Sequence, residues 1–373
     1  MKAIEFTASG TGPEAMRQAL GGIAQQLAAA GGAPMNLTAM TWTTDDPDAF
    51  DPASKAVQLA CRESFAGFCP QVLVVRGTEK LVIQAKAVFG PPPDAVPVWR
   101  GMNMAVLAQE YSPRNQVPSM QGVFDGWRAG GAAFRARHAP VEFAYGRSEW
   151  ERLDLFMPSG ATNPPLFIFI HGGYWQAADK HDHSQFAAGM LRHGYAVAMP
   201  NYSLAPIKPL FGIVAEVQAS IAFLWRAAGQ LGFDRDHITI SGHSAGGHLS
   251  AMMATTDWTQ HGLPVDTIKG AQLLSGLFDL TPHGLLPMGR LLGLDNKETI
   301  AAMSPAGRKP PDHVKLHVAV GEKESAEFRR QSKDVAISWG APPSRVVPGR
   351  QHFDLIDELI DGELLEAMLK LAP

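Results

Sequence analysis

The segment ITISGHSAGGHLS, residues 238–250, joins an apolar, β-branched run to a helix-forming run through a turn in which one serine stands between two glycines. β-Branched apolar residues favour a strand, and alanine and leucine favour a helix. Gly242 and Gly246 allow a sharp bend between these elements, and such a bend lifts Ser244 above the C-terminal end of the strand. The pentapeptide alone also fits an ordinary turn at the start of a helix, so the rest of the chain has to decide its role.

Short apolar segments alternate with helical ones on both sides of this turn, from Glu151 to the C-terminus. The clearest helix is expected at residues 213–230. Strands are expected at LDLFM (153–157), PLFIFI (165–170), YAVAMP (195–200), HITIS (237–241), AQLLSG (271–276) and KLHVAV (315–320). Strands this apolar are usually buried on both faces, which requires a mostly parallel sheet with helices on each side. We therefore expect a three-layer α/β domain over residues 151–373.

The N-terminal part of the chain shows a different pattern, with element order β-α-β-α-β-β. Its second to sixth elements are helical spacing from Met16 to Leu27, a strand within 36–46, a helix within 52–65, and strands at 71–75 and 80–89 around a turn at Gly77. The proline-rich stretch GPPPDAVPVW, residues 90–99, then indicates a linker. We expect a small α+β domain at residues 1–95, and a linker with a helical cap segment at 96–150.

The composition is that of an ordinary globular protein, with 46% hydrophobic residues and a formal net charge of −4. The absence of a basic excess argues against nucleic acid or an anionic membrane surface as partner. We find neither an uncharged apolar window of about 18 residues nor the features of a signal peptide, and we expect a cytoplasmic protein. The two cysteines, Cys61 and Cys69, are too few for a disulfide framework and match no metal motif, so we expect reduced, buried thiols.

A serine nucleophile needs a base and donors for the oxyanion, and the sequence supplies candidates for both. HGGYW, residues 171–175, follows an expected strand upstream of the serine, in the position of the HGGG-type oxyanion loop of lipases and esterases. We expect the backbone amides of Gly172, Gly173 and Tyr174, with that of Ala245 at the helix N-terminus, to bind the oxyanion.

The base and the acid are expected in the chain order serine, acid, histidine. His352 lies after a short expected strand and before an amphipathic C-terminal helix, so it is the predicted base. Glu324, on the loop after the preceding strand, is the favoured acid, and Glu322 and Asp279 remain alternatives.

Other polar and aromatic residues near these segments have less specific roles. Tyr174 and Trp175 are expected to border a pocket for a flat substrate, with packing in the core as the alternative. His243 is assigned to the substrate pocket, because a residue adjoining the serine lacks the approach that a base requires. His181–His183, the HDH segment, is expected to be polar surface, since a serine triad needs neither metal nor cofactor.

From about Met104 to its C-terminus the chain resembles the arylformamidase (kynurenine formamidase) branch of the α/β-hydrolases, close to the hormone-sensitive-lipase-like esterases. The matching segments are EYSPRNQVP (110–118), YGRSEWERLDLFMP (145–158), HGGYWQAADK (171–180), NYSLAP (201–206), GHSAGGHLSAMM (242–253), GLFDL (276–280), ESAEFRRQS (324–332) and QHFDLID (351–357). The resemblance implies the α/β-hydrolase fold, with Ser244 as nucleophile, His352 as base and Glu324 as acid. The family normally has aspartate at this last position, so the chain departs from it by one methylene.

Residues 1 to about 90 are similar to a second family, the reactive-intermediate deaminases, in the segment ALGGIAQQLAAAGGAPMNLTAMTWTTDD (19–46). This similarity implies a chorismate-mutase-like α+β fold and assembly as a homotrimer. The arginine and glutamate with which that family handles its substrate correspond here to Gln71 and Gln84. We therefore expect a non-catalytic domain whose role is oligomerisation.

These features together predict a serine hydrolase that cleaves a short-chain carboxylic ester or an aryl formamide through an acyl-enzyme. An amidohydrolase acting on an N-acyl enamine and a catalytically dead binding module remain the alternatives.

Overall fold

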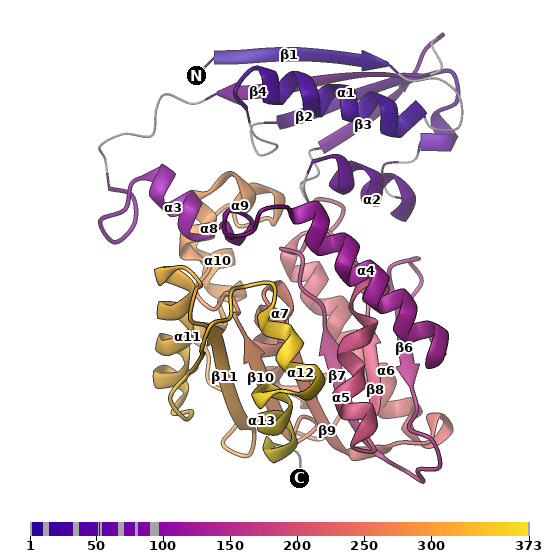
Figure 1. Ribbon diagram of the computed structural model, residues 1–373, viewed down its shortest axis with the longest axis vertical. Coiled ribbons are helices and arrows are strands. Elements are labelled where there is room, and N and C mark those ends of the chain that lie inside the picture. Colours follow the sequence, from indigo (N-terminus) through magenta and orange to yellow (C-terminus); the bar gives the residue numbers. More distant parts are fainter. Residues whose placement is uncertain are drawn as a thin grey trace.

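The computed structural model describes residues 2–9, 15–32, 37–50, 52, 54–65, 71–78, 81–89 and 97–371 (Figure 1). These residues form a four-stranded sheet near the N-terminus and an eight-stranded sheet in the larger part of the chain. Figure 1 shows the smaller sheet at one end of the molecule and the larger one at the other, joined by the segment that contains α3 (Met104–Glu110) and α4 (Met120–Arg137).

The smaller sheet has the strand order β1-β4-β2-β3, in which β2 and β3 are parallel and the other pairs are antiparallel. Its elements are β1 (Lys2–Ser9), α1 (Ala15–Ala29), β2 (Leu37–Thr44), η2 (Pro47–Phe50), α2 (Lys55–Ser64), β3 (Gln71–Arg76) and β4 (Val82–Phe89). This confirms the predicted β-α-β-α-β-β order. The apolar stripe of α1, which includes Leu20 and Ile23, packs in one core with Trp42 of β2. Cys61 on α2 is buried as expected, whereas Cys69 lies outside the described residues.

The larger sheet has the strand order β12-β11-β10-β9-β7-β8-β6-β5. Its strands are β5 (Val141–Ala144), β6 (Arg152–Phe156), β7 (Pro165–Ile170), β8 (Ala196–Pro200), β9 (Asp234–His243), β10 (Gly270–Leu274), β11 (Lys315–Gly321) and β12 (Arg345–Val347). All neighbouring strands between β12 and β8 in this order are parallel. At the other edge β6 pairs antiparallel with β8, and β5 pairs antiparallel with β6. The prediction of a mostly parallel sheet is confirmed.

Helices cover both faces of this sheet, and the alternation of side chains along β7 shows why. Leu166, Ile168 and Ile170 pack in one apolar cluster, whereas Phe167 and Phe169 pack in the other, because successive side chains of a strand point to opposite faces. The first cluster includes residues of α6 (Leu210–Leu231), α7 (Ala245–Ala254) and α11 (Ala326–Trp339); the second includes residues of α4, α5 (Ala188–Arg192), α12 (Glu358–Asp361) and α13 (Glu363–Leu371). The result is the expected three-layer domain.

Short helical segments make up most of the connections. They are η3 (Pro113–Gln116), η4 (Lys180–Ala187), η5 (Trp258–His261), α8 (Thr281–Leu285), α9 (Pro287–Leu291), α10 (Lys297–Met303), η6 (Pro305–Gly307) and η7 (Leu355–Asp357).

The larger sheet begins before the expected domain start at residue 151. β5 lies inside the segment expected to be linker and cap, and it pairs with β6. Its residues are mostly exposed, and its apolar-polar alternation covers only Val141, Glu142 and Phe143, so the strand signal is too short to separate β5 from a linker. In the same segment α4 contacts the smaller unit, since Arg128 Nη2 lies 3.3 Å from Glu63 Oε1 of α2.

Among the described residues, α6 is the helix that is long and apolar enough to cross a membrane, judged by length and composition only. Half of its most apolar window is buried inside the protein, and ten of its residues are buried. A core helix of a globular domain passes the same composition test, and here α6 covers one face of the larger sheet.

Candidate active site

Ser244 stands in a strained turn between β9 and α7. Its φ of 58° is unusual for a residue other than glycine, and such backbone strain costs about 1–3 kcal/mol and concentrates at functional sites. The flanking glycines are required by close packing. A Cβ at Gly246 would lie 1.9 Å from the carbonyl oxygen of Ile170, and one at Gly242 would lie 2.3 Å from that of Gly246. The sharp bend predicted from the glycines is therefore present.

The loop at residues 171–175 passes directly beside this turn. A Cβ at Gly172 would lie 3.2 Å from Ser244 Cβ and 2.8 Å from the carbonyl oxygen of His243, so only glycine allows this approach. The amides of Gln176 and Ala177 donate to the carbonyl oxygen of Gly173, which closes the loop into a turn. Gly173 and Tyr174 line the same cavity as Ser244.

Packing behind this loop holds it in place. The hydroxyl of Tyr202 donates to the carbonyl oxygen of His171 at 2.8 Å. The two rings stack with centroids 4.4 Å apart and an interplanar angle of 9°. Ala245, the fourth residue expected to offer an amide, is the buried first residue of α7. The residues expected to bind the oxyanion thus come from two rigid segments on either side of Ser244.

A buried carboxylate orients the predicted base. Nδ1 of His352 lies 2.7 Å from Oε2 of Glu324, and both residues are almost fully buried. The other oxygen of Glu324 accepts from the amide of Gly321 at 2.8 Å and from the hydroxyl of Ser275. A carboxylate at Nδ1 favours the tautomer that carries its proton there, which leaves Nε2 free to accept one.

The two alternative acids lie elsewhere. Glu322 is exposed, and its carboxylate accepts from the amide of Gly349. The carboxylate of Asp279 accepts from the amide of Thr281 at the start of α8. Of the three candidates, the structure brings only Glu324 against His352.

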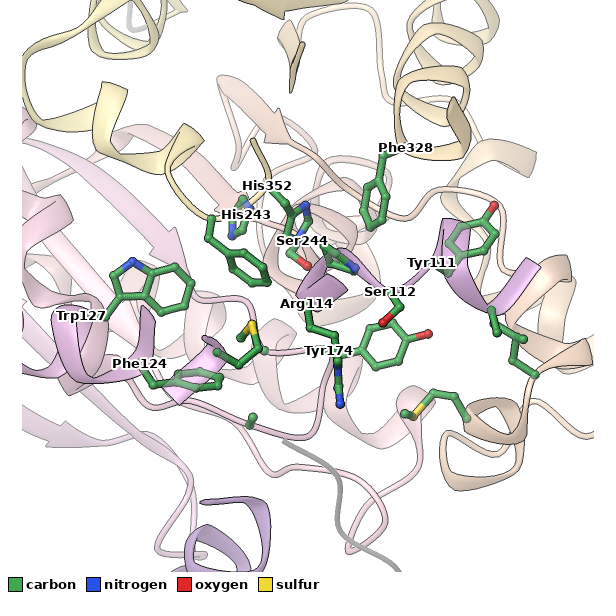
Figure 2. Close-up of a pocket in the computed structure, with 18 of the residues that line it drawn as sticks. Tyr111, Ser112, Arg114, Phe124, Trp127, Tyr174, His243, Ser244, Phe328 and His352 are labelled. Carbon is green, nitrogen blue, oxygen red and sulfur yellow. The ribbon is translucent and has the colours of Figure 1, made fainter. Parts of the chain in front are cut away.

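Ser244 and His352 line one cavity of about 1050 Å³, counting space open to solvent, and Figure 2 shows their side chains next to each other on its wall. Aromatic rings surround them: Phe124, Trp127, Tyr111, Tyr174, Phe328 and Phe353. Phe328 and Phe353 pack on His352, with ring centroids 4.7 and 5.1 Å from its own. The cavity is therefore suited to a flat, apolar substrate.

His243 also lines this cavity, as expected, and its ring centroid lies 4.6 Å from that of His352. Burial, and then the neighbouring His352 and His183, hold the pKa of His243 well below its usual value. The ring is therefore neutral at physiological pH, and it adds no charge to the cavity wall.

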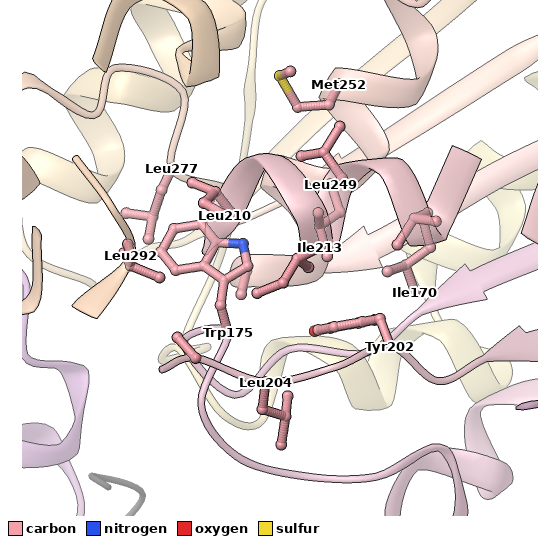
Figure 3. Packing of buried hydrophobic residues seen from close by; sticks show 14 of the residues in the cluster. Ile170, Trp175, Tyr202, Leu204, Leu210, Ile213, Leu249, Met252, Leu277 and Leu292 are labelled. Atoms are coloured by element: carbon pink, nitrogen blue, oxygen red, sulfur yellow. The ribbon is translucent and has the colours of Figure 1, made fainter. Parts of the chain in front are cut away.

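The expectation that Trp175 borders the pocket is wrong. Its side chain is fully buried and packs among Leu204, Leu210 and Leu292 in the core, as Figure 3 shows. Tyr174 and Trp175 both have a φ of 56°, and the backbone turns so that Tyr174 faces the cavity while the indole faces the core. The alternative of a core aromatic, left open by the sequence, holds for Trp175 alone.

The expectation of polar surface at the HDH segment holds for His181, which is exposed, and is wrong for Asp182 and His183, which are buried. His183 is fully buried, and burial lowers its pKa to about 3. The ammonium of Lys180, also buried, lies 2.7 Å from carboxylate oxygens of Glu142 and Asp154 and 2.8 Å from Nε2 of His181. In the described part of the chain, Glu142, Asp154 and His181 are the group of potential metal ligands close enough together to share a cation. Lys180 already supplies the positive charge, so we infer no metal site here.

Sequence reasoning missed several cavity residues. Arg114 lies in EYSPRNQVP, a segment that matched the arylformamidases without an assigned role. Phe124 and Trp127 stand three residues apart on the glycine-rich helix α4, and this pair of aromatic side chains on one helical face was the available signal.

Comparisons with known proteins agree with the fold of the larger part of the chain. The family model BD-FAE matches residues 153–272. A kynurenine formamidase of Danio rerio is 31% identical over 291 residues, covering 73% of this chain and 97% of that protein. The kynurenine formamidase of Salmo salar is 29% identical over 300 residues, covering 73% of this chain and 98% of that protein. A crystal structure of a proposed thioesterase from Silicibacter sp. TM1040 has a TM-score of 0.62 and 29% identity, covering 70% of this chain and 98% of that one.

Proposed function

The chain belongs to the kynurenine formamidase family, and we propose that it hydrolyses aryl formamides, and more broadly short-chain esters, through an acyl-enzyme formed on Ser244. The observation that carries this proposal is the contact between His352 and Glu324 at the wall of the cavity that Ser244 lines. A serine hydroxyl is a weak nucleophile until an oriented base removes its proton.

In this mechanism Oγ of Ser244 attacks the carbonyl carbon of the substrate while Nε2 of His352 takes the hydroxyl proton. Glu324 stays ionised and stabilises the imidazolium through Nδ1. The amides of Gly173, Tyr174 and Ala245, with Gly172 allowing the close approach, bind the oxygen that becomes negatively charged. Removal of one such donor typically costs about 3 kcal/mol of transition-state stabilisation.

The intermediate collapses when His352 gives its proton to the leaving nitrogen or oxygen, which releases an aromatic amine or an alcohol. Water then attacks the acyl-enzyme, with His352 again as base, and the acid and free Ser244 result. For a formamide the acid is formate. No proton or electron is left over, so no cofactor is needed.

We favour the formamide as the main substrate. The formamidase relatives match over nearly their whole length, and the formyl group is so small that the wide aromatic cavity has to accommodate the leaving amine. Short-chain esters remain the second candidate, because the same groups act on either carbonyl.

The experiment that tests the proposal combines labelling with turnover. A fluorophosphonate probe is expected to label the wild-type chain and not Ser244→Ala. N-formylkynurenine and p-nitrophenyl acetate then separate formamidase from esterase activity. Labelling without turnover of any amide or ester would support the alternative of a binding module. Turnover by folded Ser244→Ala would refute the assignment of Ser244 as the nucleophile.

We further propose that residues 1–95 form a non-catalytic, deaminase-like domain of chorismate-mutase-like type that holds the chain in a homotrimer. The element order supports this, and so does a sheet face not covered by α1, on which Leu73 is 60% exposed and Gln84 is exposed. Analytical ultracentrifugation of the full chain is expected to give a trimer that Leu73→Asp weakens. A monomeric wild-type chain would refute assembly.

A further inference from the structure

One cationic side chain lines the cavity of Ser244. Among the described residues the lining contains the guanidinium of Arg114 and no aspartate or glutamate. Most of the remaining lining is aromatic or aliphatic. A positive charge facing such a surface, without a negative one beside it, is costly unless a ligand supplies the counter-charge.

The described residues provide no ion pair for Arg114. The phenol of Tyr174 is an ionisable neighbour, and Figure 2 shows the arginine side chain beside it. A guanidinium stays charged at neutral pH even where burial lowers its pKa, as it does for Arg114. Burial raises the pKa of Tyr174, so the phenol is neutral. Tyr174 belongs to the loop next to Ser244, and Arg114, Tyr174 and Ser244 line the same cavity.

The segment that carries Arg114 is fixed to the helix that follows Glu324. Ser325 donates to the carbonyl oxygen of Glu110 at 2.7 Å, and the amide of Glu327 donates to the Glu110 carboxylate at 3.0 Å. The hydroxyl of Tyr111 donates to Glu327 at 2.7 Å. These bonds tie the chain just before Arg114 to the start of α11, so the guanidinium is presented by a braced segment rather than by a loose loop.

We propose that Arg114 binds a carboxylate on the leaving group, so that the preferred substrates are aryl formamides or aryl esters bearing an acidic substituent. This rests on the proposed function and adds the substrate class to it. The carboxylate belongs to the leaving group because a formyl group has no room for one. A guanidinium binds a carboxylate through two parallel hydrogen bonds, which also sets the orientation of the aromatic ring.

The same lining predicts a second preference. A substrate with an ammonium group in addition to its carboxylate finds no carboxylate among the described lining residues. Monoanionic substrates are therefore expected to bind more tightly than zwitterionic ones of similar size.

The test compares N-formylanthranilate with the neutral 2-formamidobenzamide, in which a primary amide of similar size replaces the carboxylate, in the full-length wild-type chain and in Arg114→Met. Charge-assisted hydrogen bonds suggest that the ratio of the two kcat/KM values falls by about 10- to 100-fold in the variant, mainly through KM. Arg114→Lys keeps the charge without the paired donors and is expected to recover part of the ratio. Arg137→Met, an exposed arginine on α4, is the matched control and keeps the wild-type ratio.

Binding of 2-aminobenzoate and aniline, measured by calorimetry, separates this inference from the proposed function. Loss of 2-aminobenzoate affinity in folded Arg114→Met supports the carboxylate site even if no formamide is cleaved. Equal affinity in the two chains, or an unchanged ratio of kcat/KM values, overturns it. Failure of the wild-type chain to cleave any formamide or ester counts against the proposed function alone.

Discussion

Replacement of Glu324 by glutamine is the most direct examination of the site, because the surrounding hydrogen bonds dictate how the new amide has to lie. One oxygen of Glu324 accepts from the amide of Gly321, which can only donate. In Glu324→Gln the amide oxygen has to keep that place, so the NH₂ group faces Nδ1 of His352 across the 2.7 Å contact. Nδ1 must then accept, and its proton moves to Nε2.

This tautomer is the wrong one for catalysis, because Nε2 carries a proton where it should remove one from Ser244. The corresponding aspartate-to-asparagine change in a serine protease triad lowers kcat by about 10⁴. We expect a loss of about 10³–10⁴ here, which corresponds to about 4–5.5 kcal/mol of activation free energy. KM should change little, since Glu324 does not line the cavity among the described residues.

Steady-state hydrolysis of p-nitrophenyl acetate between pH 6 and 9 measures this effect. Glu322→Gln is the matched control, two residues away and exposed, and it should stay within about threefold of the wild type. Retention of more than a tenth of the wild-type kcat by folded Glu324→Gln, or an equal loss in Glu322→Gln, would show that the carboxylate has been misassigned.

Three further predictions concern stability and packing. Trp175→Phe should lower the free energy of unfolding by about 1–2 kcal/mol in urea titrations while leaving KM nearly unchanged, and a large rise in KM would place the indole in the pocket after all. Gly246→Ala should lower the melting temperature and abolish turnover because its Cβ meets a backbone oxygen at 1.9 Å, whereas Gly307→Ala, with nothing within 4 Å, should do neither. The free energy of unfolding should fall as the pH drops from about 6.5 toward 4, since buried neutral histidines protonate on unfolding. Three such groups together lower it by up to about 4 kcal/mol per pH unit. A plot of the urea denaturation midpoint against pH should therefore be less steep in His283→Phe than in the wild type. The three histidines, with pKa values lowered by burial to about 3, 4 and 3, are His183, His248 and His283.

The elements of the fold were predictable wherever the signal was local. The apolar runs of β7 and β9 and the helix α6 follow from patterns within a few residues, and their positions agree with the structure. β5 was missed because the alternation of this exposed edge strand covers only Val141, Glu142 and Phe143. Its pairing depends on the neighbouring β6, which lies beyond the reach of a local signal.

The site shows the same division. The bend at Ser244 was predictable from the two glycines that flank it, and the position of His352 was predictable from the order of strands. The choice among Glu324, Glu322 and Asp279 was open, because all three follow strands whose ends meet at one edge of the sheet. Only the direction of each side chain from its loop separates them.

The sequence by itself thus determined a mostly parallel sheet, a serine on a sharp bend, a glycine loop before it and a histidine after the last strand, because each of these depends on residues adjacent in the chain. The tertiary structure alone decided that Glu324 meets His352, that Trp175 turns into the core and that Arg114 faces the cavity. These outcomes depend on which distant segments pack together and on which way a side chain leaves a turn. No local pattern records either, because the free energy that selects them comes from contacts made only when the chain has folded.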